Sequence, residues 1–202
     1  MEINSRKELK RIIKAEKQLY FNNNFYQLFL KGIKLHPDYF VWKFVKRMKT
    51  TSYYYSKRNN NIIYSILYIM SSRKMNKLAR RIGIETGENV FDENVRIFHS
   101  NGIVINGNAQ IGKNCRLYGN NCIGNNGRNN KAPYIGENVR ICVGAKVLGD
   151  ITIANNITIA AGAVVTKSCL EENAILAGIP AKIIGYNKED KKERKIDMSN
   201  IL

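Results

Sequence analysis

The chain of 202 residues has only two histidines, three prolines and one tryptophan, and it contains no long apolar run. Its longest strongly apolar stretch, residues 62–70, covers nine positions, whereas a helix that crosses a membrane needs about 20. We therefore expect no membrane-spanning segment. With His36 and His99 alone, the chain lacks the ligands for a zinc centre built on three histidines, so we expect no metal.

Cysteine is also sparse, and its spacing argues against a secreted protein held by disulfides. The four cysteines form no CxxC pair, and no basic segment followed by an apolar one opens the chain. We expect a reducing, cytoplasmic location. Cys115 and Cys169 fall where the sequence otherwise places small apolar residues, so we interpret them as compact core side chains.

Acidic residues are scarce in the first part of the chain. Residues 1–83 hold 19 lysines and arginines against four acids, a net charge of +15, whereas residues 84–202 have a net charge of +2. Zinc-binding cysteines, an aromatic RNA-binding motif and a recognition-helix pattern are missing, so we expect no nucleic-acid partner. The charge fits peripheral contact with an anionic membrane surface at the inner face of the cell membrane, or an acidic or lipid-linked glycan. A basic helical domain without such a partner is the alternative.

Helical patterns occupy this basic part. Ser5 and Glu8 have the spacing of a capping box ahead of apolar residues at helical intervals. Pro37 suits the first position of a helix rich in aromatic residues, and a further helix is expected over about 61–81. The sequence thus predicts a basic α-helical domain over residues 1–83.

A period of six residues begins at Phe91 and replaces the helical pattern. An apolar residue recurs every six positions, with one two-residue slip and one interval, NNGRNNKAPY, between Ile123 and Ile135, and a small or apolar residue lies two positions before most of them. Neither a helix nor an alternating strand has this period. It is typical of a coil of short parallel strands with three sides, in which one side chain per side points inward. The repeated positions are Phe91, Ile97, Ile103, Ile105, Ile111, Leu117, Ile123, Ile135, Ile141, Val147, Ile153, Ile159 and Val165.

These hexads resemble those of the hexapeptide-repeat acyltransferases, whose fold is a left-handed parallel β-helix. The resemblance covers residues 84–186, leaves 187–202 as a charged C-terminal tail, and implies a homotrimer. A narrower resemblance is to the serine acetyltransferase-like branch, whose H-x-x-G-I-V-I motif corresponds to residues 99–105 and whose A-x-I-G motif corresponds to residues 109–112. The stretches GAKVLGDI, AAGAVVTKS and AGIPAKIIG further along resemble the acetyl-CoA face and closing turn of that branch.

The resemblance implies acetyl transfer from acetyl-CoA with His99 as the general base. An alcohol is not ionised at neutral pH, so direct transfer needs a base within hydrogen-bond reach, and imidazole has its pKa in the useful range. In this branch a carboxylate about one coil upstream orients the histidine. Glu85 is our candidate for that carboxylate, and Asp92 and Glu93 are alternatives.

The same resemblance places the acetyl donor on small residues at the coil corners, since small side chains let the pantetheine arm approach the backbone. Lys167 matches a position that meets the adenosine or phosphate end, and Lys182 is an alternative. The expected donor contacts are Gly124, Asn125, Val143, Gly144, Ala145, Ala161, Gly162 and Lys167.

The expected acceptor follows from departures from true serine acetyltransferases. These have an aspartate directly before the catalytic histidine and an Arg-His pair before the loop proline, where this chain has Phe98, Lys131 and Ala132. A serine zwitterion would lose charged hydrogen bonds worth about 1.5 to 3 kcal/mol each. An aromatic ring instead suits the apolar face of a sugar, and Arg128 and Lys131 suit an acidic group or a phosphate. Their interval, residues 125–134, should leave the coil as a loop without changing its register.

The sequence therefore predicts an acetyl-CoA-dependent O-acetyltransferase that acts on a sugar hydroxyl of a bacterial surface polysaccharide or its precursor. The short basic helical front followed by coils resembles the capsular and exopolysaccharide O-acetyltransferases of this branch. A serine O-acetyltransferase of cysteine biosynthesis is the alternative. A β-helix that serves as a non-catalytic scaffold is a third reading, which needs no special residue at position 99.

Overall fold

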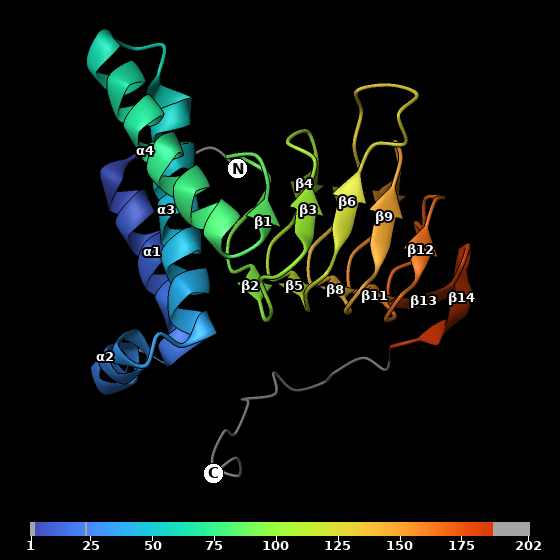
Figure 1. The fold of residues 1–202 in the computed structure, drawn as a ribbon. Coiled ribbons are helices and arrows are strands. Elements are labelled where there is room, and N and C mark those ends of the chain that lie inside the picture. Colours follow the sequence, from blue (N-terminus) through green and yellow to red (C-terminus); the bar gives the residue numbers. More distant parts are fainter. Residues whose placement is uncertain (1–2, 23, 188–202) are drawn as a thin grey trace.

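Four helices form one end of the molecule in the computed structural model, which describes residues 3–22 and 24–187 (Figure 1). They are α1 (Arg6–Phe21), α2 (Phe25–Ile33), α3 (Pro37–Lys57) and α4 (Ile62–Arg81). Helices α3 and α4 lie side by side, and α1 packs on α3. None of the described helices has both the length and the apolar character that spanning a membrane requires.

The helix ends follow the capping signals in the sequence. The hydroxyl of Ser5 accepts the N–H of Glu8 at 3.1 Å, and the carboxylate of Glu8 accepts the N–H of Asn4 at 2.8 Å. Pro37 is the first residue of α3, and the side chain of Asn61 caps α4. The predicted helix starts are confirmed.

The rest of the described chain forms a parallel β-helix of three sheets, as predicted. Sheet A contains β1 (Ile84–Glu85), β3 (Ile103–Ile105), β6 (Cys122–Gly124), β9 (Lys146–Leu148) and β12 (Val164–Val165). Sheet B contains β4 (Gln110–Ile111), β7 (Tyr134–Ile135) and β10 (Thr152–Ile153). Sheet C contains β2 (Arg96–Ile97), β5 (Arg116–Leu117), β8 (Arg140–Ile141), β11 (Thr158–Ile159), β13 (Ala174–Gly178) and β14 (Ala181–Tyr186). Strands β13 and β14 pair antiparallel and end the coil.

The core of the β-helix consists of the repeated apolar positions. Each of them, from Phe91 to Val165, is buried, because successive coils stack these side chains inward. Cys115 and Cys169 are also buried, and burial raises the pKa of the Cys115 thiol to about 12, so it stays neutral. The coil turns carry asparagines with φ between +57° and +64°, a backbone region that asparagine tolerates better than most residues. These turn residues are Asn94, Asn114, Asn138, Asn156 and Asn173.

The interval after β6 leaves the coil as a loop, seen in yellow beyond the ends of the sheet A strands in Figure 1. The register is kept across it, because Ile111 of β4 still pairs with Ile135 of β7. This part of the sequence prediction is confirmed.

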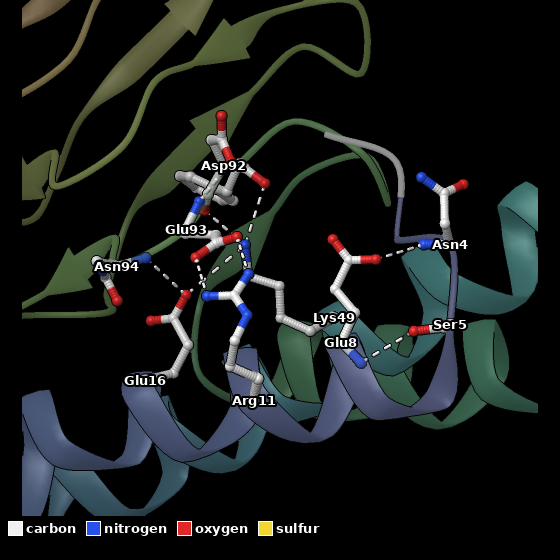
Figure 2. A network of polar contacts seen from close by, with 10 residues as sticks. Asn4, Ser5, Glu8, Arg11, Glu16, Lys49, Asp92, Glu93 and Asn94 are labelled. Carbon is white, nitrogen blue, oxygen red and sulfur yellow. Dashed lines mark hydrogen bonds and ion pairs between the residues drawn. The ribbon is translucent and has the colours of Figure 1, made fainter.

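A polar network joins the helices to the first coil (Figure 2). Arg11 of α1 forms two hydrogen bonds with the carboxylate of Glu93, at 2.9 and 2.6 Å. Lys49 of α3 donates to the carbonyl oxygen of Asp92 at 2.5 Å. Helix α4 ends at Arg81 and β1 begins at Ile84, so the chain passes from helix to coil within two residues. The predicted tail, residues 187–202, lies outside the described residues except for its first position.

Candidate active site

His99 lies in the exposed turn between β2 and β3, where the chain passes from sheet C to sheet A. Its side chain makes no hydrogen bond or ion pair with any described residue. Gly119 occupies the same turn one coil further on, with φ +108°. A Cβ atom at Gly119 would lie 2.8 Å from the Cβ of His99 and 2.9 Å from its carbonyl oxygen. Only glycine fits there. The close approach of the Gly119 backbone therefore fixes the backbone of His99 and leaves its imidazole free.

A buried amide holds the turn beneath His99. Asn121 is 1% exposed, and its Oδ1 accepts the N–H of Gly119 at 3.0 Å. Its Nδ2 donates to the carbonyl of Cys142 at 2.7 Å, which ties the turn to the next coil. Asn121 is not among the site residues expected from the sequence. Its signal was a polar side chain two positions before Ile123, where the hexad usually has a small or apolar residue.

Glycines line the edge of sheet A at which its strands begin, on the coils that follow His99. The N–H of Gly144 donates to the carbonyl of Gly119 at 3.0 Å, and the N–H of Gly162 donates to the carbonyl of Val143 at 2.9 Å. A Cβ atom at Gly162 would meet no heavy atom within 4 Å. This edge is therefore open along successive coils, as an extended pantetheine arm requires.

Four of the expected donor contacts lie along this edge together with His99. Val143 is 52% exposed, and the glycines have φ values of +74° and +68°. The residues that the fold brings together here are Val143, Gly144, Ala161 and Gly162.

Three other expected donor contacts lie at the opposite edge of sheet A, where its strands end. Gly124 ends β6 and is followed by Asn125, and Lys167 comes two residues after β12. The N–H of Gly149 donates to the carbonyl of Gly124 at 2.9 Å, which aligns this edge along the coils. The expected donor residues thus flank sheet A on both sides.

The side chain of Ala145 points away from the expected donor site. Its side chain is 0% exposed and points into the core, and its carbonyl accepts the N–H of Cys122 at 3.3 Å. Its side chain faces the core because Ala145 occupies the small inward position of its hexad, and its part in the donor site stays a prediction.

Glu85 lies in β1, away from the turn that carries His99. The strand register pairs Glu85 with Val104 on the outer face of sheet A. Among the described residues, Glu85 and His99 make no contact that would orient the imidazole. The fold of one chain therefore does not bring these two residues together, and the role of Glu85 stays a prediction.

The alternatives to Glu85 already have hydrogen-bond partners elsewhere. The carboxylate of Glu93 is paired with Arg11, and the Oδ1 atom of Asp92 accepts the N–H of Glu93 at 2.8 Å. The hydrogen bond and charge of Arg11 hold the pKa of Glu93 below its ordinary value of 4.5. The carboxylate of Glu93 and the backbone carbonyl of Asp92 thus attach the helices to the first coil, and both carboxylates already accept hydrogen bonds away from His99.

Phe98 has a partner that the sequence did not suggest. Its ring stacks on Tyr118 with the centroids 4.6 Å apart and an interplanar angle of 5°. The guanidinium of Arg96 lies 5.2 Å from the centre of the Phe98 ring. Two stacked aromatic rings therefore lie directly beside the turns of His99 and Gly119.

Arg128 and Lys131 lie in the loop that starts at the far edge of sheet A. The ammonium of Lys131 pairs with the carboxylate of Asp150 at 3.0 Å, with 72% and 48% of these side chains exposed. The N–H of Arg128 donates to the side chain of Asn126 at 3.1 Å. Within one chain the fold does not bring these two cations to His99, and their role as acceptor contacts stays a prediction.

Comparison with known proteins identifies the repeats. The family model described as bacterial transferase hexapeptide (six repeats) matches residues 132–167. The serine acetyltransferase of Staphylococcus xylosus is 38% identical over 104 residues, which are 50% of this chain and 45% of that protein. The serine acetyltransferase of Mycobacterium tuberculosis is 31% identical over 124 residues, which are 60% of this chain and 53% of that protein. The chain spans about half the length of these curated relatives.

Solved structures share the fold over most of this chain. The serine acetyltransferase of Neisseria gonorrhoeae in complex with serine has a TM-score of 0.63 at 19% identity, over 87% of this chain and 69% of that one. The serine acetyltransferase of Brucella abortus strain S19 in complex with coenzyme A has a TM-score of 0.62 at 19% identity, over 91% of this chain and 70% of that one. At these identities the likeness shows the fold.

Proposed function

We propose that this hexapeptide-repeat chain of the serine acetyltransferase type transfers an acetyl group from acetyl-CoA to a hydroxyl group, with His99 as the general base. The observation that carries the proposal is the exposed imidazole of His99, which has no partner among the described residues and lies at the head of an edge lined by Gly119, Gly144 and Gly162. A free base beside an open strip of backbone is the arrangement that direct acyl transfer needs.

His99 moves one proton in each direction during the proposed reaction. The neutral imidazole accepts the proton of the acceptor hydroxyl, and the hydroxyl oxygen forms its bond to the thioester carbonyl carbon. As the carbon–sulfur bond breaks, the imidazolium returns that proton to the departing thiolate. No cysteine carries the acetyl group, since direct transfer needs no acyl-enzyme.

The donor is proposed to bind along sheet A. The open edge with Val143, Gly144, Ala161 and Gly162 would receive the pantetheine arm, and Lys167 at the other edge would meet the phosphates. The similarity to the Brucella abortus enzyme, which was solved with coenzyme A, supports this choice of donor.

L-Serine is the first acceptor to test, because the relatives and structures reported above are serine acetyltransferases. A sugar hydroxyl of a bacterial surface polysaccharide or its precursor is the second candidate. It is favoured by the Phe98–Tyr118 stack beside His99, because flat aromatic surfaces suit the apolar face of a sugar ring.

The homotrimer implied by the family resemblance is also proposed for this chain. A second copy that supplies a carboxylate would account for the absence of an orienting partner for His99 among the described residues. Sedimentation equilibrium of the purified chain measures the oligomeric state directly.

The proposal is tested by thiol release from acetyl-CoA. The purified chain is offered L-serine and, in parallel, acidic and neutral capsule-type oligosaccharides. We expect His99→Ala to lower turnover by roughly 10² to 10⁴ while leaving coenzyme A affinity and oligomeric state unchanged. The matched control is His36→Ala, which removes the other histidine of the chain and should keep full turnover. Full activity of His99→Ala would overturn the proposal.

A further inference from the structure

A basic cleft of about 1000 Å³ lies between α4 and the first coil of the β-helix. Helix α4 runs beside β1 in Figure 1. One wall consists of exposed cations of α4, and the floor is the outer face of β1 and β3 in sheet A. The cations are Arg73, Lys74, Lys77 and Arg80, and Glu85 is the carboxylate in the lining. The volume is that of a site for a ligand of several rings or sugar units.

The cations of the cleft have no acidic partners in the described residues. None of their four side chains makes a hydrogen bond or ion pair there, and Glu85 balances at most one of the four charges. Arg73, Lys77 and Arg80 follow each other at helical spacing, so they share one face of α4. The first and last of these three residues lie about 10 Å apart along the helix axis. Such a row of like charges is suited to an anion with groups spread over the same length.

The cleft meets the candidate active site at the turn after His99. A Cβ atom at Gly83 in the cleft would lie 2.8 Å from Oδ1 of Asn101, and the carbonyl of Gly83 accepts the N–H of Ile103 at 3.1 Å. Asn101 follows His99 by two residues. The glycines that line the open edge come on later coils, on the other side of His99. The cleft therefore lies on the side of the His99 turn opposite to the proposed donor.

We propose that this cleft binds the anionic part of the acceptor, as carboxylates or phosphates carried on an oligosaccharide. The identity of the bound molecule as acceptor rests on the proposed function, whereas anion binding itself does not. Sugar units bearing several negative charges would pair with the α4 wall, while a neutral hydroxyl extends toward His99.

Calorimetric titration of the full chain tests the cleft with three probes: tetragalacturonate for carboxylates, tripolyphosphate for phosphates, and neutral maltotetraose. We expect one of the anions to bind and maltotetraose not to bind. The triple variant Arg73→Gln/Lys77→Gln/Arg80→Gln should weaken that binding by about 10- to 100-fold. The matched control is Lys7→Gln/Lys10→Gln/Lys14→Gln on α1, which removes the same charge from exposed positions outside the cleft and should keep the affinity within about twofold.

Three results would overturn the cleft proposal. One is that neither anion binds the wild-type chain, and another is that the control variant loses as much affinity as the cleft variant. The third is a changed oligomeric state of the cleft variant, because the cleft would then be a contact between subunits. Failure of the proposed function gives a different pattern. Anion binding would remain dependent on the cleft, but no acceptor would release thiol from acetyl-CoA.

A kinetic measurement tests whether the cleft binds the acceptor. The cleft variant should lower kcat/KM for an acidic oligosaccharide while the KM for acetyl-CoA stays unchanged. Equal kcat/KM values for acidic acceptors in the wild-type chain and the cleft variant would separate the anion site from the reaction and overturn its role in acceptor binding.

Discussion

Glu16 of α1 and Lys49 of α3 form a buried ion pair, with Oε1 and Nζ 3.7 Å apart and each side chain 1% exposed (Figure 2). Lys49 also donates to the carbonyl of Phe91 at 3.1 Å, and Glu16 accepts the N–H of Asn94 at 3.0 Å. The second carboxylate oxygen of Glu16 has no hydrogen-bond partner among the described residues. This pair therefore links two helices to the first coil of the β-helix, in the segment that precedes His99 in the chain.

Removal of the lysine should destabilise the protein strongly. Lys49→Met leaves the carboxylate of Glu16 buried without its counter-charge, and we expect a loss of about 3 kcal/mol in the free energy of unfolding. The measurement is chemical denaturation at a pH above the raised pKa of Glu16, about 7, where the carboxylate is charged, with exposed Lys10→Met as the control. Adding Glu16→Gln to Lys49→Met should recover part of the loss, because the uncompensated charge is then gone. A double variant no more stable than Lys49→Met would contradict this explanation.

The same pair predicts a pH dependence of stability. Burial raises the pKa of Glu16 from 4.5 to about 7, against the opposing attraction of Lys49 and the hydrogen bond from Asn94. The protonated carboxyl then contributes stability below pH 4.5 that is lost as the pH rises through about 7. Lys49, whose own pKa is lowered by burial, and Glu93 also face this carboxyl, and Asp92 acts on Lys49.

The comparison of the wild-type chain with Glu16→Gln isolates this contribution. Glutamine does not titrate, so the stability of the wild type relative to Glu16→Gln should fall between pH 4.5 and pH 7 in denaturation curves measured across that range. A difference that is constant or rises over this range would show that Glu16 does not hold its proton in the folded protein.

The β-helix could be predicted closely from the sequence, because its core repeats at a fixed interval. A side chain at each sixth position, such as Ile135 or Ile159, meets its equivalent one coil away, so local spacing determines burial. The sequence also predicts Pro37 at the start of a helix, where the structure has it.

The contacts that the sequence did not reveal are those between distant segments. Asp92 and Glu93 resemble polar residues of a coil turn, and only the packing of the helices against that turn shows that they meet Lys49 and Arg11. Ala145 was assigned to the donor site because small residues occur both at the corners and in the core of such coils. Burial alone distinguishes these two positions.

Gly119 should be needed for activity because of the turn it shares with His99. In Gly119→Ala the new Cβ atom would meet the Cβ and carbonyl of His99 at under 3 Å, at a φ of +108° that alanine rarely adopts. We expect the backbone of His99 to shift and kcat to fall by about 100-fold, since small displacements of a catalytic group cost that much. The control is Gly185→Ala in β14, where an added Cβ meets nothing within 4 Å. Unchanged kcat with an unchanged circular dichroism spectrum would show that the turn tolerates the methyl group.

Phe98 should determine whether the acceptor is an amino acid or a sugar. Serine acetyltransferases resemble this chain but carry an aspartate at this position, which would pair with the ammonium of serine. Phe98→Asp should therefore raise kcat/KM for L-serine by about tenfold or more, as a charged hydrogen bond contributes about 1.5 to 3 kcal/mol. Phe98→Asn is the matched control, because asparagine has the shape of aspartate without its charge and the substitution also breaks the stack with Tyr118. If both variants raise serine turnover equally, loss of the ring rather than gain of a charge is the cause, and Phe98 then acts by restricting access to His99.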